Sequence, residues 1–298
     1  MRKEENKARI RASDRQSPEI IYIQSVGHSG STLLSRLVNL HPDIFSMGSF
    51  RELELEPGEV EDTMCGCGRH PAVCEVWSGI SSDYAERGVG RFRGRDGRVN
   101  EEQFDRSSAV INILGRTTNS SHVCELTHDG RRVAGYVSRI PERVVLVHLV
   151  RDPRAIFRSY MRLLKPTTKR GHSGLALRIA RYYFRRHAYT LYLRVRYQPK
   201  GLRYIRVRYE DVCENPDEEL ARIFQKSGVA NFIVSANFKH ERNHIIGGNV
   251  IRFKPLHTVK DQRRFMIEFS GLRYLGLTLL NLPFLLGFRY PIFRTKRR

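Results

Sequence analysis

The chain has 298 residues, of which 40% are hydrophobic and 28% charged, and this composition excludes a disordered or fibrous protein. Its formal net charge of +21 favours polyanionic partners, such as nucleic acid, acidic glycans, anionic lipid surfaces or phosphorylated cofactors. Residues 1–17 are charged and lack an apolar core, so we expect a flexible basic tail rather than a signal peptide or an anchor. The expected location is the cytoplasm. The absence of internal repeats and low-complexity linkers predicts a single domain over residues 18–298.

A strand, a glycine-rich loop and a helix are predicted to follow one another near the N-terminus. Ile20–Ile23 form the short apolar run of a buried parallel strand, and leucines at helical spacing begin at Leu33. The residues between them include Gly27-His28-Ser29-Gly30-Ser31-Thr32. Such a loop directs backbone N–H groups and a helix N-terminus at an anion. The loop lacks the lysine of a nucleoside-triphosphate P-loop. Two interpretations remain: a site for another anion, or an ordinary turn.

A second strand-to-helix junction follows the clearest buried strand, Val144–Val150. Asp152 suits the N-cap of the next helix, and Pro153 suits its first position. Arg151 lies at the strand end and Ser159 about two helical turns later, so both side chains could converge on one phosphate. Good helix capping alone would also account for the Arg-Asp-Pro sequence.

The rest of the chain alternates between predicted strands and helices. This alternation predicts an α/β fold with a central parallel sheet and helices on both faces. In such a sheet, catalytic groups collect at the carboxyl ends of the strands, and His128 follows one of them. Strands are expected at 43–47, 122–128 and 204–209, and helices at 100–114, 174–197 and 216–228.

Three cysteines, Cys65, Cys67 and Cys74, lie close together in the sequence. With His70 they could supply four ligands for zinc, although zinc sites usually show two separated pairs of ligands. A disulfide would need an oxidising compartment. We therefore expect a structural cluster without a metal ion.

Four ordered segments between residues 20 and 255 resemble those of sulfotransferases that use 3′-phosphoadenosine-5′-phosphosulfate (PAPS), in particular bacterial and carbohydrate sulfotransferases. The segments are the glycine loop, the Arg151 junction, Tyr209-Glu-Asp before Asn215-Pro, and the loop 244–253. The resemblance implies a P-loop NTPase-like fold and transfer of the sulfuryl group of PAPS to a hydroxyl or amine of a carbohydrate, glycolipid or small metabolite. It also implies the following cofactor-binding residues: Gly27, His28, Ser29, Gly30, Ser31, Thr32, Arg151, Ser159, Tyr209 and Arg252.

The resemblance leaves three candidates for the general base. We choose His128, because the Leu126-Thr-His strand end resembles the Lys-Thr-His strand end of cytosolic sulfotransferases. A histidine with an ordinary pKa of about 6.5 is a proton acceptor at physiological pH. Glu52, about twenty residues past the glycine loop, and Glu125 are the competitors. His28 stands where the family has a lysine or arginine, and we expect it to steady the leaving oxygen.

Two other functions fit parts of the sequence. A P-loop kinase or phosphotransferase would need the missing lysine. A basic nucleic-acid-binding protein with a vestigial loop would fit the charge, but we find no RNA- or DNA-binding motif and expect no nucleic-acid partner. The expected partner is a carbohydrate or anionic acceptor. The apolar stretch 272–293 is too short to span a bilayer and predicts a packed helix or hairpin, with peripheral membrane contact as the alternative.

Overall fold

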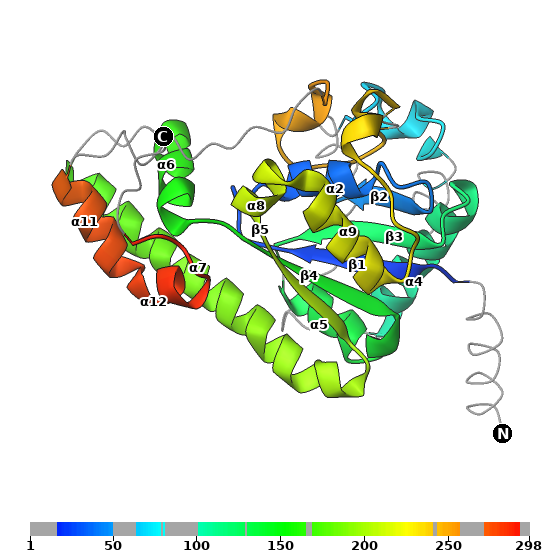
Figure 1. Cartoon of the computed structure of the whole chain (residues 1–298). Helices are drawn as coiled ribbons and strands as arrows, with labels where there is room; N and C mark the ends of the chain where they lie inside the picture. Colours follow the sequence, from blue (N-terminus) through cyan, green and yellow to red (C-terminus); the bar gives the residue numbers. More distant parts are fainter. Residues whose placement is uncertain are drawn as a thin grey trace.

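A five-stranded parallel sheet forms the centre of the computed structural model (Figure 1). The strand order is β2-β3-β1-β4-β5, and all neighbouring strands are parallel. The predicted fold class is confirmed. The strands are β1 (Glu19–Gln24), β2 (Ile44–Gly48), β3 (His122–Thr127), β4 (Val144–Val150) and β5 (Arg203–Arg208). The structure describes residues 17–49, 64–78, 80, 101–128, 130–164, 169–240, 243–256 and 271–292.

The strand order reverses between β1 and β4. The chain leaves β1 toward β2 and β3 on one side, and leaves β4 toward β5 on the other. Ligands of open α/β sheets bind at such a switch point, outside the carboxyl ends of the strands. This rule therefore predicts a ligand site between the loops that follow β1 and β4.

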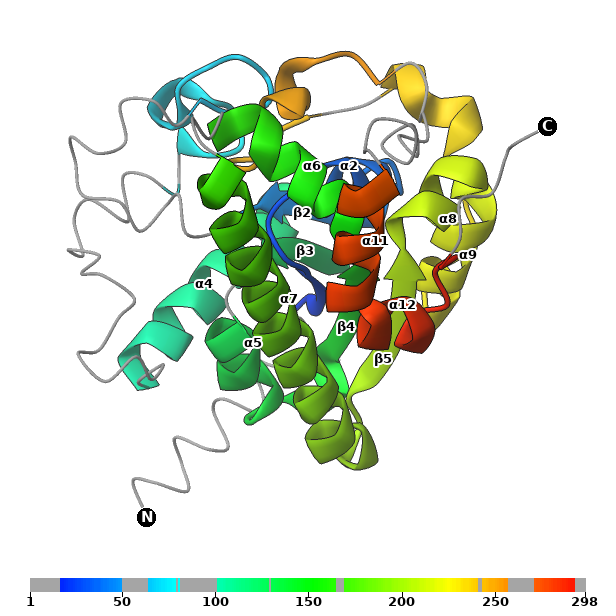
Figure 2. The same cartoon turned by 90° about the vertical axis from the view of Figure 1, so that its left-hand side faces the viewer.

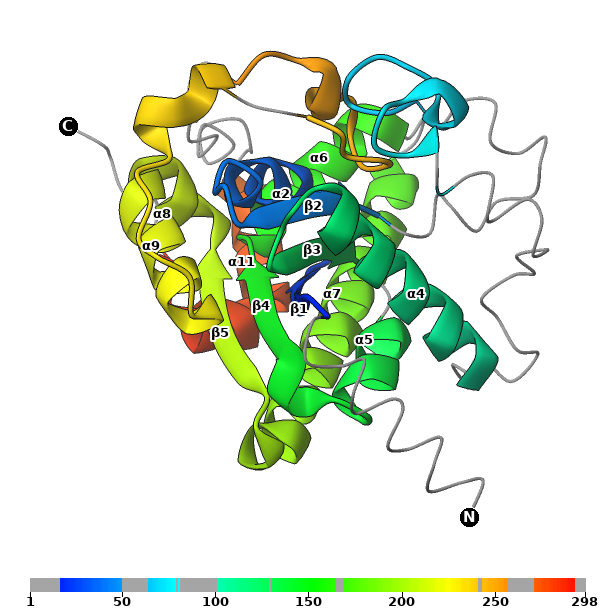
Figure 3. The same cartoon turned by 90° about the vertical axis from the view of Figure 1, so that its right-hand side faces the viewer.

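Helices cover both faces of the sheet (Figure 3). Alternate residues of β1 enter different cores: Ile21 and Ile23 pack against α2, α8 and α9, whereas Ile20 and Tyr22 pack against α4 and α5. Both faces are therefore apolar, as the continuous hydrophobic runs predicted. The helices of the first face are α2 (Ser31–Val38), α8 (Tyr209–Glu214) and α9 (Pro216–Ser227), and those of the second are α4 (Glu101–Thr117), α5 (Gly130–Val137) and α7 (Lys169–Tyr197).

The predicted boundaries are close to the observed ones, with one difference that matters for the site. Tyr209 was expected to end a strand, but it begins α8, because β5 already ends at Arg208. Short 3₁₀ segments connect several elements: η3 (Pro71–Val73), η4 (Pro141–Arg143), η5 (Gln198–Lys200), η6 (Ser235–His240) and η7 (Val250–Phe253).

The C-terminal apolar stretch forms two helices, α11 (Gly271–Leu280) and α12 (Leu282–Gly287), which bury some apolar side chains and leave others, such as Leu272, Leu275 and Leu279, exposed. They lie beside α7 and α6 (Pro153–Leu164), as Figure 2 shows. Their buried side chains share a core with those helices, including Leu277, Leu285 and Phe288. Within the described part of the chain, no helix combines the length and the apolar character needed to cross a membrane.

Candidate functional site at the β1–β4 switch point

The loop between β1 and α2 has a backbone shape that depends on glycine. Gly30 has φ 88° and is the N-cap of α2, without a side-chain hydrogen bond to the helix. A Cβ at Gly30 would lie 2.2 Å from the ring of Tyr209, so no other residue allows this close packing. The first turn of α2 holds no acidic residue. The positive end of the helix is therefore available to an anion.

Four of the predicted cofactor residues meet around this loop. Arg151, directly after β4, donates from Nη1 to the carbonyl oxygen of His28 at 2.8 Å. Its guanidinium lies 4.2 Å from the centre of the Tyr209 ring. Ser159 Oγ lies 3.0 Å from His28 Nδ1. The structure thus brings His28, Arg151, Ser159 and Tyr209 together at the switch point of the sheet.

The charge state of this cluster follows from its burial. Burial lowers the pKa of His28, and the neighbouring Arg151 lowers it further, so the imidazole is neutral near pH 7. If the Ser159 hydroxyl donates to Nδ1, the neutral ring carries its proton on Nε2. Arg151 then remains the positive charge of the cluster.

Two buried polar atoms of the site have no hydrogen-bond partner among the described residues: Ser29 Oγ and Arg151 Nε. Ser29 is fully buried, and Arg151 is only 8% exposed. Buried donors in proteins are almost always paired. Unpaired donors beside a free helix N-terminus fit an anionic ligand that supplies the missing acceptors.

Tyr160 belongs to the same cluster, although no sequence motif pointed to it. A Cβ at Gly27 would lie 2.8 Å from the Tyr160 hydroxyl, and the His28 ring meets the Tyr160 ring edge-on at 4.3 Å. The available signal was its place next to Ser159 on α6. Tyr160 therefore forms one wall against the glycine loop.

The loop 243–256 closes over α2. Asn249 N donates to Thr32 Oγ1 at 3.1 Å, and Arg36 Nη1 donates to the carbonyl of Ile251 at 2.6 Å. Arg252 lies on this closing loop and donates from Nη1 to the carbonyl of Gly248 at 2.7 Å. Thr32, one residue after Ser31 in the first turn of α2, is thus shared between the glycine loop and the closing loop.

The candidates for the general base occupy different environments. His128 follows β3, and its Nδ1 lies 3.3 Å from both Ser25 Oγ and Ser25 O, directly after β1. Glu125 is buried, and its Oε1 lies 2.6 Å from Arg132 Nε. Glu52 lies outside the described residues. Of the two described candidates, only His128 lies at the edge where β1 and β3 end.

The cysteine cluster differs from its prediction in one member. His70, the expected neighbour, is exposed, and its Nδ1 accepts from Ala72 N at 3.2 Å. The histidine that lies against the cysteines is His244, on the closing loop. The choice of His70 was wrong, because proximity in sequence does not determine which side chains meet in the fold.

A sequence-family model described as the sulfotransferase family matches residues 94–232, which include Arg151, Ser159 and Tyr209. The fold is similar to the sulfotransferase domain of the Synechococcus PCC 7002 olefin synthase, with 18% identity, 93% of this chain and 96% of that chain covered, and a TM-score of 0.51. It is also similar to mouse sulfotransferase SULT7A1 complexed with PAP (11% identity; 90% and 85% covered; TM-score 0.51). A third similar structure is the sulfotransferase domain of the curacin biosynthetic pathway (14% identity; 84% and 86% covered; TM-score 0.50). No curated protein matches the sequence.

The match to the sulfotransferase family model is confined to residues 94–232, slightly less than half of the chain. Over that part the sequence is similar to sulfotransferases, and the α/β fold is similar to theirs. The identities with the solved structures are low, so that likeness concerns the fold alone.

Proposed function

We propose that the protein transfers the sulfuryl group of PAPS to a hydroxyl or amine of a carbohydrate, a glycolipid or a small metabolite. The observation that carries the proposal is the convergence of the glycine loop with Arg151, Ser159 and Tyr209 at the switch point of the sheet. The unpaired donors Ser29 Oγ and Arg151 Nε fit the oxygens of such a donor molecule.

Each part of the cluster has a separate binding role in this proposal. The backbone N–H groups and hydroxyls of residues 27–32 hold the 5′-phosphosulfate end, at the helix N-terminus that favours anions. Arg151 and Ser159 hold the 3′-phosphate, for which a guanidinium and a hydroxyl are suitable donors. Tyr209 lies beside the adenine, and Arg252 completes the phosphate site from the closing loop.

PAPS supplies an activated sulfuryl group, so the protein's task is mainly positioning and charge stabilisation. His28, which is neutral, donates a ring N–H toward the leaving oxygen, while Ser159 donates its single hydroxyl proton to the 3′-phosphate instead of to His28 Nδ1. His128 accepts the proton of the acceptor hydroxyl or amine. Arg151, fixed between His28 and Tyr209, holds its positive charge near the 3′-phosphate of the donor.

Titration calorimetry with PAP, ATP and duplex DNA tests the proposal. PAP should bind at one site per chain and more tightly than ATP, because ATP lacks the 3′-phosphate that Arg151 and Ser159 would hold. Tighter binding of ATP would support a kinase or phosphotransferase. Saturable binding of DNA without any binding of PAP would support a nucleic-acid-binding protein, and either result would contradict the proposal. Incubation with radiolabelled PAPS and a panel of sugars and glycolipids would then identify the acceptor class.

A further inference from the structure

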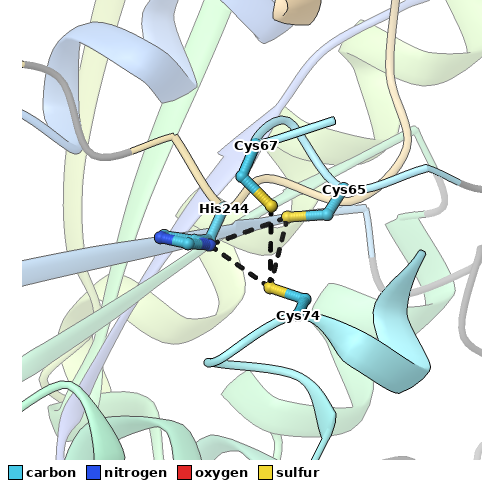
Figure 4. Close-up of side chains that lie close together, drawn as sticks. All are labelled: Cys65, Cys67, Cys74 and His244. Atoms are coloured by element: carbon cyan, nitrogen blue, oxygen red, sulfur yellow. Dashed lines mark hydrogen bonds between the residues drawn. The ribbon is translucent and has the colours of Figure 1, made fainter. Parts of the chain in front are cut away.

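Four side chains with metal-binding atoms point toward one another at the junction of two distant segments (Figure 4). Cys65, Cys67 and Cys74 come from residues 64–78, and His244 comes from the closing loop. Their three Sγ atoms and the histidine nitrogen all lie within 4.8 Å of one another. No part of this cluster is used by the proposed sulfuryl transfer.

The distances fit the corners of a tetrahedron around one ion. Zinc bonds of about 2.3 Å to sulfur and about 2.0–2.1 Å to nitrogen imply tetrahedral edges of about 3.8 Å between sulfurs and about 3.6 Å between sulfur and nitrogen. The Sγ atom of Cys74 lies 3.8 Å from that of Cys67 and 3.7 Å from that of Cys65. His244 Nδ1 lies 3.8 Å from Cys65 Sγ and 3.3 Å from Cys74 Sγ.

A disulfide or an iron–sulfur cluster fits this geometry less well than a single ion does. The two sulfur atoms of a disulfide lie about 2.05 Å apart, much closer than the sulfur atoms of this cluster. One disulfide would also use only two of the three cysteines. All three cysteines are free in the structure. An iron–sulfur cluster takes four protein ligands around several metal ions, mostly cysteines, and needs a wider cage than these edges enclose. Three thiolates and one imidazole are suitable ligands for a single borderline-soft metal ion such as Zn²⁺.

The surroundings hold the ligands in place as they do around known metal sites. His244 Nε2 lies 3.2 Å from Glu75 Oε1, an arrangement that fixes the ring and leaves Nδ1 facing the thiols. Trp77 Nε1 donates to the carbonyl of His244 at 2.7 Å. Gly68, with φ 82°, closes the turn that returns its N–H to the carbonyl of Cys65 at 2.8 Å. The two segments are joined further by a backbone bond from Gly66 N to Ile245 O at 2.9 Å.

We propose that Cys65, Cys67, Cys74 and His244 bind one structural Zn²⁺ ion. Four protein ligands leave no open coordination position, which distinguishes a structural site from a catalytic one. The sequence alone favoured a cluster without metal, because the fourth ligand is more than 160 residues away from the cysteines. The ion would fix the closing loop to residues 64–78, and this loop is the one that contacts Thr32 and carries Arg252.

The metal content of the full chain tests the site without any use of PAP, so its outcome is independent of the proposed activity. Protein produced in zinc-supplemented medium and purified under reducing conditions without chelator should carry about one zinc per chain by elemental analysis. His244→Ala and Cys74→Ser should lose most of the zinc. His70→Ala and Cys213→Ser should keep it, because these residues lie outside the cluster. Substoichiometric zinc in the wild-type protein, or full zinc in His244→Ala, would overturn the proposal.

If the ligand variants fail to fold, binding of Co²⁺ to the wild-type protein tests the proposed metal site instead. The wild-type protein loaded with Co²⁺ should show the intense visible bands of a tetrahedral site and thiolate-to-metal charge transfer in the near ultraviolet. Equimolar Zn²⁺ should abolish both signals, and a chelator should lower the melting temperature of the zinc protein. Weak octahedral bands without charge transfer would mean that the thiols do not bind the ion, and the proposal would be wrong.

Discussion

The two strand-to-helix junctions, one after β1 and one after β4, differ in how the polar groups at their helix starts are paired. After β4, Asp152 Oδ1 accepts from Arg154 N at 2.9 Å, and the Arg154 guanidinium reaches Asp152 Oδ2 at 2.6 Å. After β1, Gly30 caps α2 without a side chain, and Ser29 Oγ has no partner among the described residues. This difference favours the first junction as the place where an anionic ligand would bind. The second is built to hold the fold, and it contributes Arg151 and Ser159 to the first.

Arg154 provides the strongest test of the structural junction. Its guanidinium is fully buried and also donates to Tyr274 OH at 2.8 Å and to the carbonyl of Pro291 at 2.7 Å, which ties the C-terminal segment to α6. Arg154→Met should lower the free energy of unfolding by about 3–5 kcal/mol, because it leaves the Asp152 carboxylate buried without its partner. Urea denaturation measures this loss. Arg162→Ala, an exposed arginine on the same helix, should change stability by less than about 0.5 kcal/mol. A loss below about 1 kcal/mol for Arg154→Met would contradict the structural role.

A third strand end, that of β3, should carry the chemistry rather than the binding. His128→Ala should lower kcat by roughly 10²–10⁴ and spare PAP affinity, as the loss of a positioned base does. Turnover is measured with radiolabelled PAPS once an acceptor is known, and PAP affinity by calorimetry. Near-normal turnover of this variant together with an inactive Glu52→Gln would assign the base to Glu52 instead.

The structural junction should also make stability depend on pH. Glu210 accepts from Asp152 N at 3.1 Å and from Tyr290 OH at 2.9 Å. Burial raises the pKa of Glu210 from 4.5 to about 7, and the nearby Asp152 carboxylate raises it too. Between these two values the folded state keeps a proton that the unfolded state releases, so stability falls as the pH rises through this window.

Glu210→Gln removes this titration and should separate it from that of other groups. As the pH rises from about 5 to about 8, the unfolding free energy of the variant minus that of the wild type should increase by about 3 kcal/mol. Urea denaturation of both proteins at several pH values measures the difference. A difference that stays constant over this range would mean that Glu210 titrates alike in the folded and unfolded states.

The sequence predicted both junctions because each is encoded within a short stretch. An apolar strand, a glycine loop and leucines at helical spacing define the first, while Asp152 and Pro153 mark the helix start of the second. The parallel sheet followed from the alternation of elements, although its strand order did not. Groups that meet only through tertiary structure and belong to none of the resembling segments' assigned residues were missed. His244 lies far from the cysteines in sequence, and the bonds from Arg154 to the C-terminal segment join residues more than 100 positions apart.

Arg151 tests the difference between the two junctions most directly. It directly follows β4 and so belongs to the structural junction in the sequence, but its side chain contacts the glycine loop of the other junction. Arg151→Ala should weaken PAP binding by roughly 1.5–3 kcal/mol, the scale of a lost charge-assisted hydrogen bond. Affinity for adenosine 5′-phosphosulfate, which lacks the 3′-phosphate, should stay nearly unchanged, because the glycine loop would hold the part that both ligands share. Calorimetry with both ligands measures the two losses, and Arg162→Ala should alter neither. Equal losses for both ligands would show that Arg151 acts by supporting the glycine loop through the His28 carbonyl, and its assignment to the 3′-phosphate would then be wrong.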